Sequence, residues 1–305
     1  MKFLLLSDIH ATSKSPVSRK DNILDAFIKK FSFVLEYADE HDCTILQAGD
    51  FFHRPRDWRL LFLAMDLIEN SDVHIYTIYG QHDLYLYSDV EDSPTTLSIL
   101  GKAGYVDKLG SKPIHVGNAH IYGCDYESKV PVPKQLDYHD GEVNVLVIHH
   151  GIAADGLFPD HDFTSPLHFM KENPGYDLIL AGDIHRQFIK KTRKHGVLLN
   201  TGPMVRYDGT KYNMTHEPSF FVWDSEEGDI EKVVIPHKPS DKVLNRDHIE
   251  RSRGIKDAAE AFAEAMKNTE IDEYSVKKII KRIVKELRPG KRVKKILAEA
   301  MSDEY

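Results

Sequence analysis

The chain has too few cysteines and no apolar run long enough to suggest a secreted or membrane protein. Its 305 residues include two cysteines, Cys43 and Cys124, and a disulfide framework needs more. Both lie beside or inside apparent buried strands, so we expect reduced core residues. No run approaches the roughly 20 apolar residues that cross a bilayer. Because Asp8 and His10 interrupt the apolar start before a signal peptide is complete, we expect a cytoplasmic protein that binds no membrane.

Histidine is the residue in excess. The composition is otherwise that of a globular protein, with 41% hydrophobic and 29% charged residues, and it excludes disordered and fibrous classes. The 17 histidines are several more than such a chain usually carries, so we expect some of them to be ligands. The formal charge of -8 is unevenly distributed. Residues 276–296 contain ten Lys or Arg and one acid, which leaves -17 for the rest of the chain, so an acidic body carries a basic tail.

Short apolar runs alternate with helical patterns through the first part of the chain. The runs lie at 3–6, 44–47, 73–79, 143–148 and 178–181, and the helical patterns at about 21–39, 58–69 and 94–102. This alternation predicts an α/β domain in which helices cover a sheet. Later strands at 196–200, 219–224 and 230–235 are joined by turns, which predicts antiparallel pairing in the second half of the sheet. After Pro239 the pattern is helical, so we place a domain boundary near residue 238.

Potential metal ligands follow the predicted strands where each strand ends. They are Asp8 and His10, Asp50 and His53, Gln81, His82 and Asp83, His149 and His150, and Asp183 and His185. Such strand ends carry the functional loops of α/β sheets. Because burying so many ionisable groups without ions would cost several kcal/mol each, we interpret the five clusters as a metal site rather than as polar core residues.

The types of ligand indicate the chemistry. Carboxylate, imidazole and carboxamide groups without cysteine suit Mn, Fe or Mg more than structural zinc. A shared carboxylate would indicate two ions about 3.5 to 4 Å apart. Such a pair clamps a phosphate group and lowers the pKa of a bridging water towards neutrality. The pattern therefore predicts hydrolysis of a phosphoester.

From residue 7 to residue 185 the order of motifs resembles that of the calcineurin-like metallophosphoesterases. Within that family, Gly49-Asp50-Phe51-Phe52-His53 is similar to the Gly-Asp-Leu-Phe-His of SbcD-type DNA repair nucleases. Residues 176–185 and 200–206 are similar to further nuclease segments. The resemblance implies an α/β four-layer metallophosphoesterase sandwich, with mixed sheets flanked by helices and a C-terminal helical appendage.

The resemblance also implies two metal sites that share Asp50. The first is Asp8, His10, Asp50 and His185, and the second is Asp50, Gln81, His149 and Asp183. His82 would stabilise charge on the phosphate or protonate the leaving oxygen, oriented by Asp83, and His53 would face the substrate. His150 should point away from His149, behind the ligands or into the core.

Two positions depart from the family pattern. Gln81 stands where the family has Asn, and Asp183 stands where it usually has His. A third carboxylate would hold the second ion tightly and favour hard ions such as Mn or Mg, while weakening that ion as a Lewis acid. The alternative is that Asp183 lies behind the ligands and the second site is weak or empty.

The function implied by the resemblance is a Mn-dependent DNA nuclease, acting as exonuclease or endonuclease in repair and recombination. Two divalent ions would be its cofactors, Mn before Mg or Fe. Residues 1–238 would be catalytic, and residues 239–305 would bind DNA or an SbcC-type ATPase through basic helices. Because the acidic body opposes DNA binding, the tail or the partner has to offset phosphate repulsion.

Two other functions stay open. One is a phosphodiesterase for cyclic nucleotides or other small molecules, with the helical tail forming a homodimer. The other is a catalytically weak, metal-stabilised scaffold in which Asp183 has abolished turnover.

Overall fold

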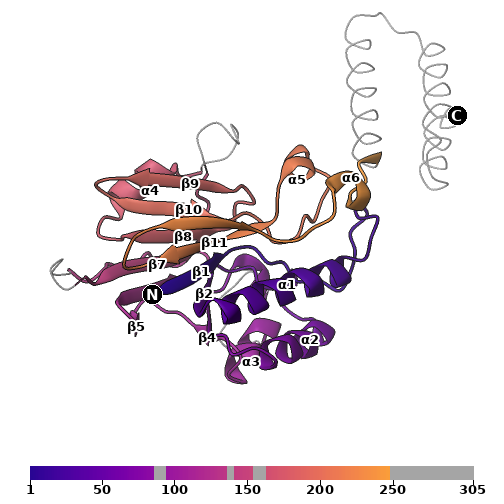
Figure 1. Ribbon diagram of the computed structural model, residues 1–305, viewed down its shortest axis with the longest axis horizontal. Coiled ribbons are helices and arrows are strands. Elements are labelled where there is room, and N and C mark those ends of the chain that lie inside the picture. The colour runs from indigo at the N-terminus through magenta and orange to yellow at the C-terminus, as the bar shows by residue number, and fades with distance from the viewer. Residues whose placement is uncertain (86–93, 136–140, 154–162, 248–305) are drawn as a thin grey trace, which may run out of the picture. The chain divides into compact units, whose positions relative to one another are not determined.

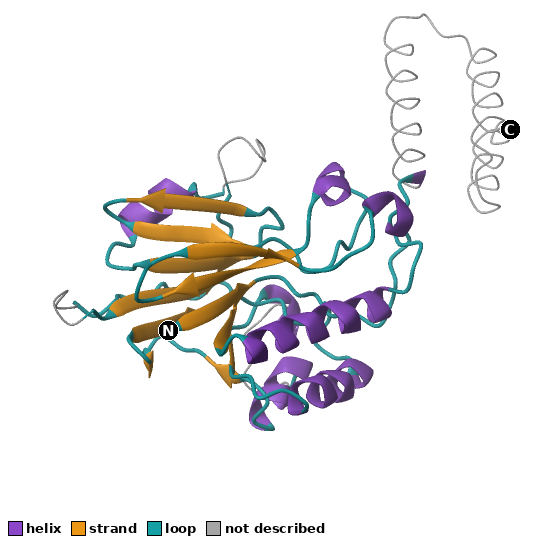
Figure 2. Cartoon of the chain, viewed as in Figure 1, coloured by secondary structure: helices purple, strands orange, loops and turns teal. Residues whose placement is uncertain are grey.

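The computed structural model describes residues 1–85, 94–135, 141–153 and 163–247. The chain divides into two compact units, Met1–Asn245 and Arg246–Tyr305. In the first unit, two six-stranded mixed sheets pack face to face, and helices lie on their outer sides (Figures 1 and 2). The predicted four-layer α/β sandwich is thus confirmed. The helices expected in the tail fall on residues 248–305, outside the described residues, and the division into a catalytic and a binding domain stays a prediction.

The first sheet has the order β12-β11-β1-β2-β3-β4. Its strands are β1 (Lys2–Leu6), β2 (Cys43–Gln47), β3 (Ile75–Thr77), β4 (Asp107–Lys108), β11 (Ser219–Asp224) and β12 (Ile230–Val234). Strands β1 to β4 are parallel, and β11 and β12 are antiparallel. We had expected the late strands to extend the second half of a single sheet. Strands β11 and β12 instead lie beside β1 in the first sheet.

The second sheet has the order β5-β6-β7-β8-β10-β9. Its strands are β5 (Ile114–Val116), β6 (Ala119–Cys124), β7 (Val143–His149), β8 (Leu178–Gly182), β9 (Phe188–Thr192) and β10 (Gly196–Asn200). The four central strands are parallel, and the edge strands β5 and β9 are antiparallel. The carboxyl ends of β7 and β8 are therefore adjacent, which brings the residues after them together.

Three helices cover the first sheet and one covers the second. They are α1 (Ile23–Glu40), α2 (Trp58–Glu69) and α3 (Thr96–Lys102) on the first sheet, and α4 (Pro166–Glu172) on the second. Asn22 caps α1 and Asp57 caps α2, because each side chain accepts a hydrogen bond from a backbone N–H of the first turn. Two short helices, α5 (Lys211–Thr215) and α6 (Ser240–Val243), lie in connecting segments.

Alternation along β1 shows how the layers are built. Phe3 and Leu5 point into the core between the sheets, whereas Leu4 and Leu6 pack under α1 and α2. All four side chains are fully buried, as expected for a central strand that is covered on both faces. The two cysteines are free and buried, as predicted. Within the described ranges, no helix is long and apolar enough to cross a membrane.

Candidate metal centre

The residues after β1, β2 and β8 have an unusual backbone. Of the six described residues other than glycine with positive φ, four are predicted ligands: Asp8 at 47°, His10 at 47°, Asp50 at 52° and Asp183 at 85°. This conformation costs energy in residues with a side chain and persists where surrounding structure enforces it. The backbone N–H of His10 donates to the Asp50 carbonyl at 2.9 Å, so the first two loops hold each other.

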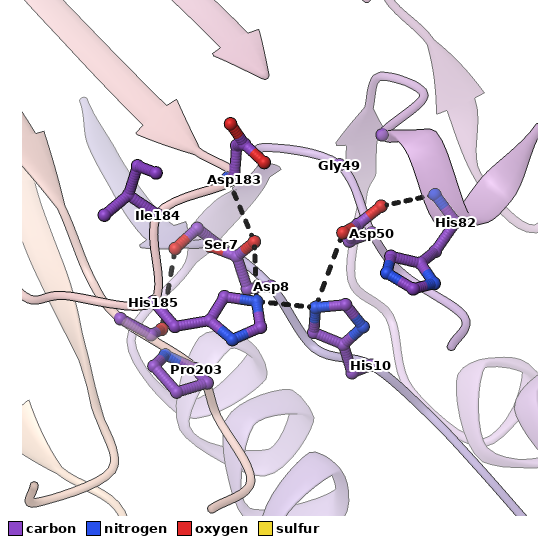
Figure 3. A network of polar contacts seen from close by, with 12 residues as sticks. Ser7, Asp8, His10, Gly49, Asp50, His82, Asp183, Ile184, His185 and Pro203 are labelled. Carbon is purple, nitrogen blue, oxygen red and sulfur yellow. Dashed lines mark hydrogen bonds and ion pairs between the residues drawn. The ribbon is translucent and has the colours of Figure 1, made fainter. Parts of the chain in front are cut away.

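The first predicted group of ligands is gathered in one place (Figure 3). Its members, each offering one ligand atom within 4.8 Å of the others, are Asp8, His10, Asp50 and His185. His10 Nε2 lies 2.8 Å from His185 Nε2 and 3.4 Å from Asp50 Oδ2. His185 Nε2 lies 3.6 Å from Asp8 Oδ1. The three inner residues are buried, and His185 is 41% exposed at its side chain, so the group opens to solvent on the His185 side.

Two carboxylate oxygens in this group have no hydrogen-bond partner. Asp8 Oδ2 and Asp50 Oδ2 are buried and accept no hydrogen bond, although their second oxygens accept backbone N–H groups from Asp183 and His82. A buried unpaired carboxylate oxygen is costly unless a cation compensates it. The donor set of two carboxylates and two imidazoles therefore fits a divalent metal ion.

The second predicted group forms a chain of contacts next to the first. His149 Nε2 lies 3.5 Å from Asp50 Oδ2 and 2.8 Å from Gln81 Oε1. Gln81 Nε2 donates to Asp183 Oδ1 at 3.0 Å. His149 Nδ1 lies 2.7 Å from the Ala48 carbonyl, which can only accept, so Nδ1 carries the proton. A neutral ring then presents a bare Nε2 to two oxygens, so a proton or a metal ion has to lie between them.

The pKa shifts of the buried groups also indicate that the centre needs a positive charge. Burial by itself lowers the pKa of His149, but the adjacent Asp50 carboxylate outweighs it and raises that pKa to about 10. Burial would raise the pKa of Asp50, but His149 and His10 outweigh it and lower that pKa. Burial holds the pKa of His10 well below its usual value despite Asp50, so that ring is neutral and able to bind metal. The buried Asp50 carboxylate therefore favours a positive charge beside it, which a bound cation would supply.

His53 and His82 lie together on the solvent side of His10. Their rings stack at 5.0 Å between centroids, and His82 Nδ1 lies 3.0 Å from the His53 carbonyl. The backbone N–H of His82 donates to Asp50 Oδ1 at 2.9 Å. Burial and the neighbouring His82 lower the pKa of His53 to about 4. With His10 these two form another group of three possible ligands.

Asp83 takes a place different from the one that we expected. We had placed it beside His82 as an orienting group, but its carboxylate accepts backbone N–H groups from Phe51, Phe52 and Gly80 at 3.0 to 3.2 Å. Burial and the nearby Asp50 carboxylate raise the pKa of Asp83 to about 8. Asp83 therefore joins the loops after β2 and β3, and it positions His82 through the backbone.

His150 also differs from expectation. It is exposed and lies against Phe169 of α4, with ring centroids 6.0 Å apart, so it is neither a core residue nor a neighbour of the ligands. Sequence reasoning missed Tyr207, whose ring lies 4.4 Å from that of His53. Its only sequence signal was its place directly after the nuclease-like turn that ends at Arg206.

Glycines leave the space that these side chains need. Gly49 has φ +76°, and a Cβ there would lie 2.5 Å from His149 Nδ1. A Cβ on Gly80 would collide with the Asp50 carboxylate. Any larger residue at either position would push a predicted ligand away.

Comparison with known proteins gives one family and distant relatives. Residues 1–187 match the calcineurin-like phosphoesterase family. The DNA double-strand break repair protein Mre11 of Methanosarcina mazei is 27% identical over 186 residues, which are 56% of this chain and 28% of the relative. The Mre11 protein of Methanosarcina acetivorans is 28% identical over 187 residues, with the same shares. The chain therefore spans less than a third of the length of these curated relatives.

The fold comparison finds the crystal structure of a protein from Thermus thermophilus. The match covers 77% of this chain and 99% of that chain, at 9% sequence identity and a TM-score of 0.48.

Proposed function

Because the chain belongs to the calcineurin-like phosphoesterase family, we propose that it is a metal-dependent phosphodiesterase that cleaves DNA. The phosphoesterase chemistry rests on one observation above all: Asp8 Oδ2 and Asp50 Oδ2 are buried without a hydrogen-bond partner, and Asp50 Oδ2 lies close to two histidines. The choice of DNA as substrate rests on the likeness to the two Mre11 repair proteins.

We assign two divalent ions to this centre. Asp8, His10, Asp50 and His185 would hold one ion, and Asp50, Gln81, His149 and Asp183 would hold the other. When bound, such ions polarise phosphoryl oxygens and lower the pKa of a bound water. Mn is our choice for both because the donors are mainly oxygen and imidazole, with Mg and Fe as alternatives.

The chain's own residues bind and orient the substrate. The backbone N–H of His82 fixes Asp50 Oδ1, so the second oxygen of this carboxylate keeps its direction towards His10 and His149. The His82 ring, supported by His53 below it, supplies charge or a proton at the leaving oxygen. His53, half-buried and set against Tyr207, contacts the substrate strand.

The negative net charge of the chain has to be offset before DNA can bind. The chain carries a net charge of -8, and a phosphate backbone is repelled unless basic residues offset that charge. We propose that residues 239–305 bind an SbcC-type ATPase, and that this partner or the basic tail compensates the repulsion in DNA repair and recombination. Formation of a homodimer through the same residues is the alternative arrangement.

A substrate screen tests the proposal. The full chain is incubated with Mn, Mg or Fe and with linear duplex DNA, circular plasmid DNA or an aryl phosphodiester, each with and without the candidate ATPase. We expect Mn-dependent DNA cleavage that the ATPase stimulates, and none by an Asp50→Ala variant. Hydrolysis of aryl or cyclic diesters without DNA cleavage would assign the chain to small-molecule phosphodiesterases. Absence of all hydrolysis with every metal would favour the scaffold function.

A further inference from the structure

A second polar site lies beside the amino-terminal turn of α1. A cavity of about 290 Å³ opens there. Its basic lining residues are Arg19, Lys29, Lys30, Arg206, His237 and Lys238. None of them belongs to the metal centre.

Three of these cations are buried. The side chain of Arg19 is 3% exposed, Lys30 is 6% exposed and Arg206 is 4% exposed. Arg19 forms an ion pair with Asp21 at 2.7 Å. Asp25, the other acid of the lining, is exposed on the rim. Three buried cations thus face one partly buried carboxylate, and buried charge without a counter-charge is expensive.

Some N–H groups of the three cations have no hydrogen-bond acceptor. Lys30 Nζ donates to the Met204 carbonyl at 2.8 Å, and Arg19 Nη1 donates to the Arg206 carbonyl at 2.7 Å. Arg206 donates through Nη2 to the Lys238 carbonyl. The Nε atoms of Arg19 and Arg206 are buried and have no partner. Both arginines line the cavity together with Lys30, so the positive charge of all three lies at its wall.

The surroundings strengthen the demand for an anion. Burial lowers the pKa of Lys30 well below its usual value, and Arg206 and Arg19 act in the same direction. The first turn of α1, an 18-residue helix, contributes Asn22, Asp25 and Ala26 to the wall. The positive end of the helix dipole therefore faces the same space.

We propose that this cavity binds a phosphate group. A phosphate dianion matches the excess of about two positive charges, and its oxygens accept charge-assisted hydrogen bonds from several directions, which suits a wall that carries two arginines and a lysine. The cavity is larger than a bare phosphate, so the group arrives as inorganic phosphate, on a nucleotide or at the 5′ end of a nucleic acid. The inference does not rest on the proposed nuclease function, because no residue of the metal centre takes part.

The test compares phosphate binding by the full chain and by Lys30→Met. Methionine keeps the length of the side chain and removes its charge. Calorimetric titration with inorganic phosphate should show saturable binding by the wild type and at least tenfold weaker binding by Lys30→Met. The matched control Lys190→Met changes an exposed lysine of β9 and should bind like the wild type. Phosphate held by the metal centre is common to all three proteins, so the difference reports the cavity.

Two further measurements keep the proposal falsifiable. Thermal melting without phosphate should place Lys30→Met at or above the wild type, because a buried charge is gone. Ala26→Glu puts a carboxylate into the cavity, and should melt higher than the wild type while losing phosphate binding. Equal phosphate affinity in the wild type and Lys30→Met, or no saturable binding by the wild type at millimolar phosphate, would overturn the proposal.

The same titration identifies the source of the phosphate. Separate titrations use inorganic phosphate, deoxyadenosine monophosphate, and a deoxyoligonucleotide with or without a 5′ phosphate. Tighter binding of the 5′-phosphorylated oligonucleotide that depends on Lys30 assigns the cavity to a nucleic-acid end, and equal binding of inorganic phosphate assigns it to the free ion. If neither inorganic phosphate nor the nucleotide nor the 5′-phosphorylated oligonucleotide shows affinity that depends on Lys30, the phosphate assignment falls.

Discussion

The side-chain amide of Gln81 donates a hydrogen bond to the Asp183 carboxylate, with 3.0 Å between Nε2 and Oδ1. These are the two positions at which the motifs depart from the family pattern, so the departures are in contact. The other end of the amide, Oε1, lies 2.8 Å from His149 Nε2. One glutamine therefore joins a predicted ligand to the unusual aspartate, and the shorter asparagine has one methylene less with which to do so.

This contact predicts that the two departures act as a pair. Gln81→Asn removes the donor to Asp183, and Asp183→His removes its acceptor, so each change alone should lower hydrolysis and metal content. The double variant restores the family's usual pair and should lose much less than the two single losses combined, by roughly tenfold or more in turnover. Asp183→Asn is the control that keeps the shape and removes the charge. Additive losses would show that the two side chains act independently.

Asp50→Ala should be the most damaging single change in the centre. Asp50 Oδ2 faces both His10 and His149, so its loss removes the group shared by both predicted ion sites. Turnover should fall by at least 10³-fold, while circular dichroism stays unchanged. The control Asp42→Ala removes an exposed aspartate just before β2, the strand that Asp50 follows. Two bound ions per chain and near-normal turnover in Asp50→Ala would refute the bridging role.

His82→Ala should lower turnover without loss of metal. The His82 ring lies over His53, and its Nδ1 faces a backbone carbonyl, so we predict that it lies beside the ligands and not among them. The expected loss is roughly 10² to 10⁴-fold, as for a group that supplies a proton or charge. His150→Ala, at an exposed histidine that follows the predicted ligand His149, should stay close to wild-type turnover. Metal analysis decides the matter, because depletion in His82→Ala would make His82 a ligand.

Sequence periodicity was sufficient to predict the bounds of helices and strands that have a cap or a regular apolar pattern of their own. Helix α2 begins and ends at the predicted residues because Asp57 caps it and its apolar positions recur with helical spacing. Strands β10 and β11 also match their predicted bounds. Strands β4 and β5 were not predicted, because two or three partly exposed residues carry no detectable pattern. The pairing of β11 with β1 joins residues more than 200 positions apart, and no local signal specifies such a pairing.

The site was predictable only in part, for a related reason. The ligands could be named because they follow strands, and parallel strands end at one edge. The contact of Gln81 with Asp183 depends on side-chain rotamers, and the use of Asp83 to hold backbone N–H groups depends on how two loops approach each other. Neither is encoded by spacing along the chain.

The pH dependence of stability should report His216. Burial lowers its pKa to about 4 and outweighs the hydrogen bond to the Pro203 carbonyl, which raises it. Nδ1 lies 3.1 Å from the Tyr212 hydroxyl, and only a neutral ring can accept a hydrogen bond there. Between pH 6.5 and 4 the unfolded chain binds the extra proton, so the contribution of His216 is complete above pH 6.5 and is lost as the pH falls.

Urea titrations of the wild type and His216→Gln test this linkage. Going from pH 6.5 to pH 4, the wild type should lose roughly 3 kcal/mol more unfolding free energy than the variant. Taking the difference cancels the histidines of the metal centre. His41→Gln, which changes an exposed histidine, should keep the wild-type slope. Parallel curves for the wild type and His216→Gln would show that the pKa of His216 is not lowered in the folded protein.

The segment between the predicted boundary near residue 238 and Asn245 is packed into the first unit. Val243 is 3% exposed and Leu244 is 2% exposed. The backbone N–H of Lys20 donates to the Val243 carbonyl at 3.0 Å, and that of Asn245 donates to the Ser18 carbonyl at 2.6 Å. A truncation after residue 238 would remove these contacts, whereas a truncation after residue 245 would keep them.

The two truncations should therefore differ in stability and agree in partner binding. Chain 1–238 should unfold with roughly 3 kcal/mol less free energy than chain 1–245, because two aliphatic side chains lose their burial. Chain 1–245 should retain metal and hydrolyse a small phosphodiester like the full chain, but should no longer co-purify with an SbcC-type ATPase, since the proposed docking residues are gone. Equal urea midpoints for the two truncations would contradict the packing argument. Capture of the ATPase by chain 1–245 with unchanged affinity would place the docking surface within the described unit and not in residues 246–305.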